Sequence, residues 1–285
     1  MVINWFPGHM TKALRTMQKE IKNIDCVVYV VDARAPFACL NPEFDKLIAG
    51  KATLVAVNKI DLCDKEKLLP VLPKLKNHFG ENADIITLDS TTSGSGKKIF
   101  DKIENLCKDK IQKNRLKGIN TFIRAMVIGV PNCGKSTLIN NLCGKAKTIT
   151  GDKAGVTRGK QWVTVSKNVQ IMDTPGTLYP NLGNEKTAKY LAYIGSIKNE
   201  VLDFSELALE FVRDISIQYP EALPNRYGIE EVPEGLDNFE VAGVLEKIAE
   251  NRHFVTKGGE VDYERVALTV LDDFKKSRLG KITLL

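Results

Sequence analysis

Long apolar runs are missing from this 285-residue sequence, so no membrane-spanning helix is expected. The first residues contain neither the apolar core of a secretion signal nor an arginine- and serine-rich transit segment, which favours a cytoplasmic protein. The six cysteines include no C-x-x-C pair, which argues against a zinc ribbon. In a cytoplasmic chain we expect these thiols to be reduced and mostly buried.

Charge is distributed unevenly along the chain. Residues 1–180 contain 28 Lys and Arg against 16 Asp and Glu, a net charge of +12, whereas residues 181–285 have a net charge of −6. A basic half of this kind is typical of a protein that binds a polyanion. Scattered lysines that serve only solubility would give the same balance, so charge alone leaves both interpretations open.

The hydrophobic pattern predicts two structural regions. In residues 1–180, buried strands are expected over 26–31, 53–57, 84–88, 121–129, 161–165 and 168–172, and helices over 10–24, 97–110 and 135–142. Residues 109–120 are polar and basic and are expected to form a bridging segment. Residues 181–285 show only helical spacing, over 185–195, 200–219, 239–251 and 262–276. The fold class expected is therefore α/β with a mainly parallel sheet, followed by a smaller all-α domain.

A glycine-rich segment between an expected strand and helix has the spacing G-x-x-x-x-G-K-S, from Gly129 to Ser136. Backbone N–H groups of such a loop wrap phosphates, and the helix that follows adds its positive dipole end. Lys135 is predicted to reach the β- and γ-phosphates, and the Ser136 hydroxyl to hold magnesium. The predicted nucleotide contacts of this segment are Asn132, Cys133, Gly134, Lys135, Ser136 and Thr137.

Two further segments are expected beside the γ-phosphate. Asp173 and Gly176 form a D-x-x-G motif at the end of the last strand, where Asp173 is predicted to orient magnesium and the Gly176 N–H to sense the phosphate. Thr157 is the predicted switch threonine and a second magnesium ligand. Thr148 and Thr150 lie in the same loop and compete for that role.

The segment Asn58-Lys59-Ile60-Asp61 follows an apolar strand and predicts a guanine site. The Asp61 carboxylate can accept hydrogen bonds from the guanine N1–H and exocyclic amine, and adenine offers no such pair of donors. Asn58 and Lys59 would brace the loop and cover the ring. Asp89 and Ser90, which end the next strand, are expected on the other side of the base. An ATP-using kinase is disfavoured for the same reason.

The order of these motifs is unusual, because the guanine motif precedes the phosphate loop by about seventy residues. A circularly permuted P-loop GTPase domain is therefore expected over residues 1–180, followed by a helical domain over 181–285. The chain resembles the circularly permuted GTPases, and within them the ribosome biogenesis GTPase A (YlqF) family. The resemblance rests on residues 5–10, Asp32-Ala-Arg34-x-Pro36, the motifs above, and residues 271–274 and 279–283.

The resemblance implies a GTPase of low intrinsic turnover that is stimulated by the ribosomal subunit. Such a switch would bind rRNA and the pre-ribosome in its GTP state, assist late assembly of the large ribosomal subunit, and leave after hydrolysis. Partners would include rRNA and ribosomal proteins, the chain would be a monomer, and no membrane would be involved. The alternative is a GTP-regulated protein-binding scaffold whose hydrolysis is incidental.

Two residues bear on catalysis. The glutamine that orients water in Ras-like enzymes is replaced by Thr177, where the family usually has an apolar residue. The family's proposed substitute is His9, which could equally brace the N-terminal segment. The catalytic residues predicted are thus His9, Lys135, Thr157 and Gly176. Asn132 stands where potassium-using GTPases have asparagine, so potassium is a candidate cofactor beside GTP, GDP and magnesium, unless this side chain only caps a turn.

Three basic stretches are candidate rRNA contacts. They are the helix stripe Lys12, Arg15, Lys19 and Lys22, the segment 108–117, and Lys275, Lys276, Arg278 and Lys281. Beyond Gly176 the chain runs directly into the helical region. The state of the nucleotide could therefore bias the orientation of the helical domain with only one connection to move.

Overall fold

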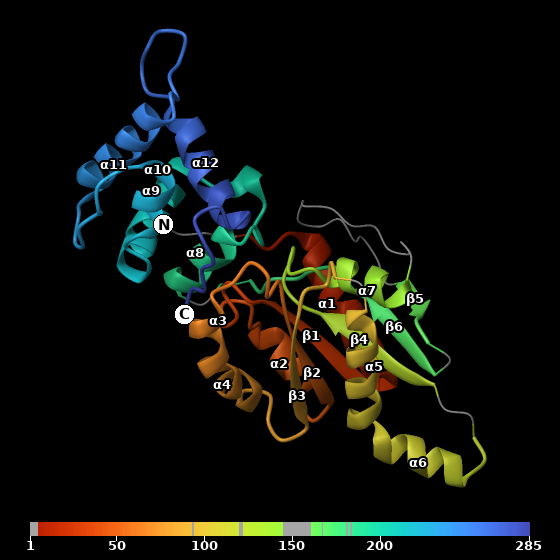
Figure 1. Ribbon diagram of the computed structural model, residues 1–285. Coiled ribbons are helices and arrows are strands. Elements are labelled where there is room, and N and C mark those ends of the chain that lie inside the picture. The colour runs from red at the N-terminus through yellow and green to blue at the C-terminus, as the bar shows by residue number, and fades with distance from the viewer. Residues whose placement is uncertain are drawn as a thin grey trace.

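The computed structural model of the protein describes residues 5–92, 94–119, 122–144, 161–166, 168–180, 182 and 184–285. At its centre lies a six-stranded sheet with the order β3-β2-β1-β4-β6-β5 (Figure 1). The strands are β1 (Cys26–Asp32), β2 (Ala52–Asn58), β3 (Ala83–Leu88), β4 (Ile123–Ile128), β5 (Gln161–Thr164) and β6 (Val169–Asp173). The edge strand β5 is antiparallel to β6, and the other neighbouring pairs are parallel, which confirms the mainly parallel sheet.

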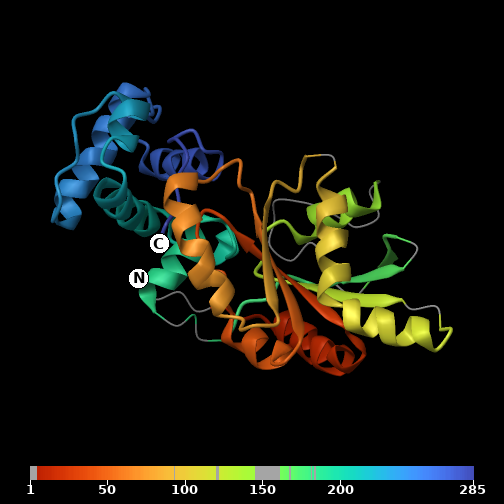
Figure 2. The same cartoon turned by 60° about the horizontal axis from the view of Figure 1, so that its bottom comes forward.

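Helices cover both faces of this sheet, which is why every residue of β1 is buried. The helices of the sheet unit are α1 (Gly8–Glu20), α2 (Pro42–Ile48), α3 (Lys65–Leu68), α4 (Leu72–Asn77), α5 (Ser95–Leu106) and α7 (Lys135–Cys143). Figures 1 and 2 show α5 and α7 together on one face and α1 and α2 on the other. Helix α1 buries Met10, Ala13 and Met17, as its amphipathic spacing predicts.

The segment predicted to bridge, residues 109–120, begins as a helix between α5 and β4, a conformation that the sequence pattern did not predict. Helix α6 (Lys108–Leu116) buries none of its residues and projects from the sheet unit at the end opposite the helical region (Figures 1 and 2). Its lysine, arginine, glutamine and leucine residues are good helix formers, although they contain no apolar stripe. Intrinsic propensity thus decides the conformation here, and a search for hydrophobic periodicity misses it.

The second region is helical, as expected. It contains α8 (Glu185–Tyr193), α9 (Phe204–Gln218), α10 (Ala222–Tyr227), α11 (Asn238–Asn251) and α12 (Tyr263–Lys275). Helix α12 packs against α9 and α11, and a capping box between Asp237 and Glu240 starts α11. Helix α10 was not expected, because six residues that include Pro224 show no helical period. None of the described helices is long and apolar enough to cross a membrane.

The last residues of the chain return to the sheet unit. The Leu284 N–H donates to the Arg34 carbonyl at 2.7 Å, and the Thr283 hydroxyl lies 3.1 Å from the Asp64 carbonyl oxygen. Ile282 and Leu284 are buried, and one continuous buried cluster includes side chains of both regions. The expectation of a single connection to move was therefore wrong, because the helical region is also held by its C-terminal end. The division at residues 180 and 181 stays a prediction.

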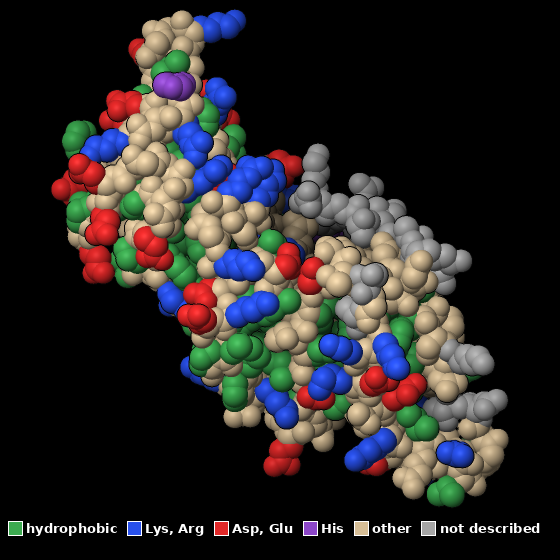
Figure 3. Space-filling model, viewed as in Figure 1, with side chains coloured by type: hydrophobic (Ala, Val, Ile, Leu, Met, Phe, Trp, Pro, Cys, Tyr) green, Lys and Arg blue, Asp and Glu red, His purple; other side chains and the backbone are tan. Residues whose placement is uncertain are grey.

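The two regions differ in surface charge, as their sequences require. On the face shown in Figure 3, acidic side chains gather at the outer edge of the helical region. Lysine and arginine gather where that region approaches the sheet unit.

Candidate nucleotide site

The guanine motif and the phosphate loop meet at the carboxyl ends of the strands. Strand β1 lies between β2 and β4, so the residues that follow β2 and β4 emerge at the same edge of the sheet. The Asn58 side chain joins them, because its Nδ2 donates to the Cys133 carbonyl at 2.9 Å and its Oδ1 accepts from the Ser90 N–H at 3.0 Å. Asn58 is fully buried. One amide group thus ties the three loops predicted to hold the nucleotide.

A close approach at this junction accounts for Gly134. The residue has φ of +98°, and a Cβ at this position would collide with the Asn58 amide nitrogen. Glycine is therefore required both by the left-handed backbone and by the space that Asn58 occupies. The second glycine of the phosphate loop and the asparagine of the guanine motif are therefore packed directly against each other.

The base end of the site contains the remaining guanine-motif residues. The Ile60 N–H donates to the Leu88 carbonyl at 3.2 Å, and the next residue, Asp61, is exposed and open to a ligand. Asp89 is used internally, because its carboxylate accepts from the backbone N–H and hydroxyl of Thr91 at 2.8 and 2.6 Å. Burial is the largest single effect and raises the pKa of Asp89, but the hydrogen bonds from Thr91 and Thr92 together outweigh it and hold that pKa below its usual value. Asp89 therefore shapes the loop of Ser90.

Helix α7 supports the same loop from behind. The Asn141 side-chain amide donates to the Ser90 carbonyl at 3.1 Å and to the Thr92 carbonyl at 2.7 Å. Sequence reasoning missed Asn141. Asn141 lies two turns into the helix that follows the phosphate loop, on the side of the guanine motif. Its contact could have been predicted only from a three-dimensional arrangement of the permuted segments.

Lys59 connects the base end to the phosphate loop. Its ammonium donates to the Asn132 carbonyl at 2.6 Å and lies 2.9 Å from Asp32 Oδ2. Lys59 and Asn132 both have left-handed backbone conformations, with φ of +62° and +58°. Such conformations are costly for residues other than glycine and cluster at functional sites.

The phosphate loop is tightly packed at its other side. Gly129 follows β4, and Lys135 begins α7 with its ammonium 2.7 Å from the Val130 carbonyl oxygen. Gly176 of the D-x-x-G motif is so close that a Cβ there would lie 2.6 Å from Pro131 Cα and 2.9 Å from Lys135 Nζ. The structure thus brings the predicted residues Lys135 and Gly176 together, and no larger residue fits at 176.

A buried carboxylate marks the place predicted for magnesium. Asp173 is fully buried, and its Oδ2 lies 3.3 Å from the Ser136 hydroxyl oxygen. Within the described part of the chain, Asp173 Oδ1 has no hydrogen-bond partner although it is buried. Burial raises the pKa of the Asp173 carboxyl, and Lys135 and Ser136 offset part of that rise. An orphaned carboxylate oxygen beside a serine hydroxyl fits the oxygen ligands that magnesium prefers.

The remaining predicted residues are placed less fully. Thr137 lies half-buried in the first turn of α7. Thr157, with its competitors Thr148 and Thr150, lies outside the described residues. His9 is exposed at the start of α1, with its ring 6.5 Å from that of Trp5, and burial together with Lys198 lowers its pKa.

In the described residues no hydrogen bond joins His9 to the phosphate loop, so its catalytic role stays a prediction.

The helical region also contacts the phosphate loop. The Asn132 side-chain amide donates to the Gly195 carbonyl at 2.7 Å, and the Ser196 hydroxyl donates to the Pro131 carbonyl at 2.7 Å. Gly195 and Ser196 follow directly after α8. Sequence reasoning did not identify Ser196, because nothing in its local pattern distinguishes it from an ordinary turn residue.

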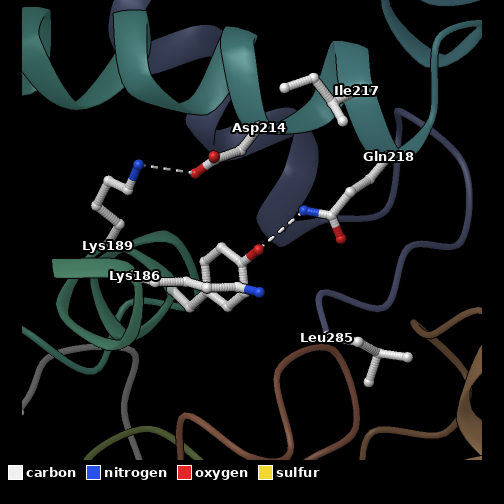
Figure 4. Close-up of a pocket in the computed structure, with 7 residues that line it drawn as sticks. Lys186, Lys189, Asp214, Ile217, Gln218 and Leu285 are labelled. Atoms are coloured by element: carbon white, nitrogen blue, oxygen red, sulfur yellow. Dashed lines mark hydrogen bonds and ion pairs between the residues drawn. The ribbon is translucent and has the colours of Figure 1, made fainter. Parts of the chain in front are cut away.

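A separate cavity of about 400 Å³ lies between α8, α9 and the last residue (Figure 4). It is lined by Lys186, Lys189, Tyr190, Asp214, Ile217, Gln218 and Leu285. Lys189 pairs with Asp214 at 3.4 Å, and Gln218 donates to the Tyr190 hydroxyl at 2.8 Å. These polar groups are satisfied by one another, and none of the predicted site residues lines this cavity.

Known proteins resemble this chain over nearly its whole length. The family described as "50S ribosome-binding GTPase" matches residues 124–226. A Bacillus cereus protein named "Ribosome biogenesis GTPase A" is 37% identical over 285 residues, which cover 99% of this chain and 93% of that protein.

Two solved structures of YlqF are similar throughout. The GDP-bound structure has a TM-score of 0.65 and 25% identity, and covers 95% of this chain and 98% of its own. The GNP-bound structure from Thermotoga maritima has a TM-score of 0.64 and 27% identity, with 96% and 97% covered. The family match at 124–226 contains the phosphate loop but not residues 58–61, which the structure places beside it. This agrees with the permuted order of the motifs.

Proposed function

Because the chain belongs to the ribosome biogenesis GTPase A family, we propose that it is a GTP-hydrolysing switch that assists late assembly of the large ribosomal subunit. It binds the pre-ribosome in its GTP state and leaves after hydrolysis, in the cytoplasm and as a monomer. The observation that carries the nucleotide part of the proposal is the bridging of three loops by Asn58. That bridge joins a base-reading motif to a phosphate-binding loop in one site.

At the base end, the Asp61 carboxylate accepts from the guanine N1–H and amine, since it is exposed and follows a loop fixed by Asn58 and Ile60. Lys59 covers the face of the ring. The Ser90 loop, whose Ser90 and Thr91 N–H groups are bonded to Asn58 and Asp89, lies on the opposite side of the base. Selection of guanine over adenine follows from the carboxylate, because adenine offers no pair of donors to it.

At the phosphate end, the N–H groups from residues 132–137 and the Lys135 ammonium bind the β- and γ-phosphates. Lys135 exchanges its bond to the Val130 carbonyl for bonds to phosphate, which are stronger because both partners are charged. Ser136 and Asp173, with Thr157 as the third proposed ligand, would hold magnesium, which would supply positive charge beside the phosphates. The Gly176 N–H senses the γ-phosphate.

Water is oriented by a residue other than the missing glutamine, and His9 is the candidate. His9→Ala is expected to lower stimulated turnover and to leave GTP affinity intact. Equal losses of turnover and affinity, or no loss of either, would contradict the proposal. Asn132 is the candidate potassium residue, and its contact to Gly195 would fix the orientation of its side chain. Identical turnover in potassium and sodium at equal ionic strength would contradict that role.

The rRNA contacts are assigned to the sheet unit. Lys12, Arg15 and Lys19 are exposed on α1 and Lys22 in the turn that follows it, and α6 adds a second basic surface. Lys110 of α6 pairs with Asp25, which lies between α1 and β1 in the chain. The third predicted stretch is engaged within the protein, because Lys276 pairs with Asp272 at 2.8 Å and Arg278 with Asp273 at 3.0 Å. The proposed rRNA contacts are therefore those of the first two stretches.

The test is co-sedimentation with large ribosomal subunits. Binding is expected with a non-hydrolysable GTP analogue and is expected to fall sharply with GDP, while added subunits raise GTP turnover. Binding that depends on nucleotide but involves only isolated proteins, with no stimulation by subunits, would favour the alternative of a GTP-regulated protein scaffold. Binding that ignores nucleotide would contradict both forms of the switch.

A further inference from the structure

A buried ion pair stands beside the nucleotide site without any part in the chemistry described above. Asp32 and Arg34, at the end of β1, are 0% and 2% exposed. The guanidinium grips the carboxylate with both arms, through Nε to Oδ1 at 2.9 Å and Nη2 to Oδ2 at 2.7 Å. Burial alone would raise the pKa of the Asp32 carboxyl, but Arg34 and Lys59 outweigh it and hold that pKa well below its usual range. The carboxylate is therefore charged.

On one side this pair reaches the nucleotide loops. The Lys59 ammonium is shared between Asp32 Oδ2 and the Asn132 carbonyl oxygen, at 2.9 and 2.6 Å. Lys59 and Asn132 are two residues of the site that have left-handed backbone conformations without being glycine. The buried charge of Asp32 holds the Lys59 ammonium against the Asn132 carbonyl and so favours these backbone conformations. A lysine without such a partner would not favour them.

On the other side the pair reaches the helical region. Arg34 Nη1 donates to the carbonyl of Lys275, the last residue of α12, at 2.9 Å, and the Arg34 carbonyl accepts from Leu284. The guanidinium also lies 5.5 Å from the ring centre of Phe274. A cation at the carboxyl end of a helix is stabilised by the helix dipole, so α12 favours the observed position of Arg34.

The contacts form a closed circuit. From the phosphate loop it runs through Lys59, Asp32 and Arg34 to the end of α12. It returns through α9 and α8 to Gly195, which accepts from the Asn132 side chain in the same loop. Sequence reasoning noted Asp32 and Arg34 only as part of a family signature.

We propose that Arg34 is a positioning residue for nucleotide binding, which holds Asp32 and through it Lys59 in place and makes nucleotide affinity depend on the docking of α12. This inference rests on the proposed guanine-nucleotide site and adds its regulation by the helical region. Because coupling between two sites is reciprocal, bound nucleotide must also strengthen the contact between Arg34 and the end of α12.

The test compares two arginine variants of the full chain. Arg34→Met is expected to weaken binding of fluorescently labelled GDP by about tenfold, which corresponds to roughly 1.4 kcal/mol. Affinity for the inosine nucleotide, which lacks the exocyclic amine of guanine, is expected to fall by the same factor. The reason is that the variant leaves Asp61, the residue that reads this amine, in place. Arg34→Lys keeps the charge and is expected to recover part of the affinity.

Arg226→Met is the matched control. Arg226 pairs at 2.7 Å with Asp273, a second fully buried aspartate, but within the helical region. It is expected to lower thermal stability and to leave GDP affinity within about twofold of wild type. Equal losses of affinity in Arg34→Met and Arg226→Met would reduce the role of Arg34 to general stability and overturn the proposal.

Hydrogen exchange on the wild-type chain provides an independent measurement if Arg34→Met fails to fold. GDP is expected to slow exchange of the amide of Leu284, which bonds to Arg34, and of amides 276–278 at the end of α12. No slowing at these amides would also overturn the proposal. If the wild type itself does not bind GDP, the proposed function fails; if it binds and Arg34→Met binds equally well, only the role of Arg34 fails.

Discussion

The base end and the phosphate end of the candidate site are built differently. At the base end, the polar groups of Asn58, Lys59 and Asp89 are satisfied by the protein itself. At the phosphate end, Asp173 keeps a buried oxygen without a partner among the described residues, and Lys135 rests on a backbone carbonyl. We therefore propose that the base end is assembled before nucleotide binds, whereas the phosphate end is completed by the nucleotide. Two aspartates that end strands, Asp32 and Asp173, show the same contrast, with pKa values shifted in opposite directions.

The largest effect is expected at the phosphate end. Lys135→Ala removes the only proposed cation that reaches the phosphates from the loop, and charge-assisted bonds of this kind are worth about 1.5–3 kcal/mol each. GDP affinity is expected to fall at least about 100-fold, while the unfolding midpoint in urea changes little. Titration of labelled GDP measures the loss, and a fall of less than threefold would contradict the role.

Substitutions at the base end should lower the stability of the protein as well as its affinity for nucleotide. Asn58→Ala leaves the Cys133 carbonyl and the Ser90 N–H without their described partner in a buried place. The free energy of unfolding without nucleotide is expected to fall by about 2 kcal/mol. Urea unfolding followed by circular dichroism measures it. An unchanged midpoint would show that this end is not preassembled.

Asp173→Asn separates the two ends most clearly. Because burial raises the pKa of this carboxyl, its charged form is unfavourable in the folded protein without ligand. The amide is expected to raise the free energy of unfolding by about 1 kcal/mol and to abolish the effect of magnesium on GTP affinity. Denaturation without nucleotide, paired with titrations with and without magnesium, provides the check. A loss of stability would contradict the account of this carboxylate.

The smallest effect concerns acid sensitivity at Asp32. Its folded-state pKa is lowered, so its contribution to stability is complete above the unfolded value of about 4 and is lost as pH falls below that value. Between pH 4 and pH 3 the wild type should lose about 1 kcal/mol more of its unfolding free energy than Asp32→Asn does. Urea unfolding at both pH values measures the difference. Equal losses of unfolding free energy in the wild type and Asp32→Asn would show that the charged form of Asp32 is not stabilised in the folded protein.

Much of the fold follows from the sequence, because apolar strands and glycine-rich loops are local signals. The strands and the long helices of both regions agree with expectation within a few residues. The helix within 109–120 was not predicted because α6 has helix-forming residues but no apolar face. Helix α10 is too short to show a helical period, and the bond of Leu284 to Arg34, just after β1, is a long-range contact that no local pattern encodes.

The candidate site shows the same limit. Motif spacing predicted that residues 58–61 and 129–136 meet, and the Asn58 bonds show them in contact. The contacts of Asn132 with Gly195 and of Arg34 with Lys275 join residues 63 and 241 positions apart. Such bonds depend on how two regions pack, so sequence alone suggested neither Ser196 nor the relation between Arg34 and Lys59.

A crystal structure of the full chain with GDP and magnesium tests the central claim most directly. One nucleotide is expected to contact Asp61 through the edge of its guanine and Lys135 through its β-phosphate, with Asn58 still bonded to the Cys133 carbonyl and the Ser90 N–H. A nucleotide that touches only one of Asp61 and Lys135, or that lies in the cavity beside Lys186, would contradict a single site made of segments in permuted order.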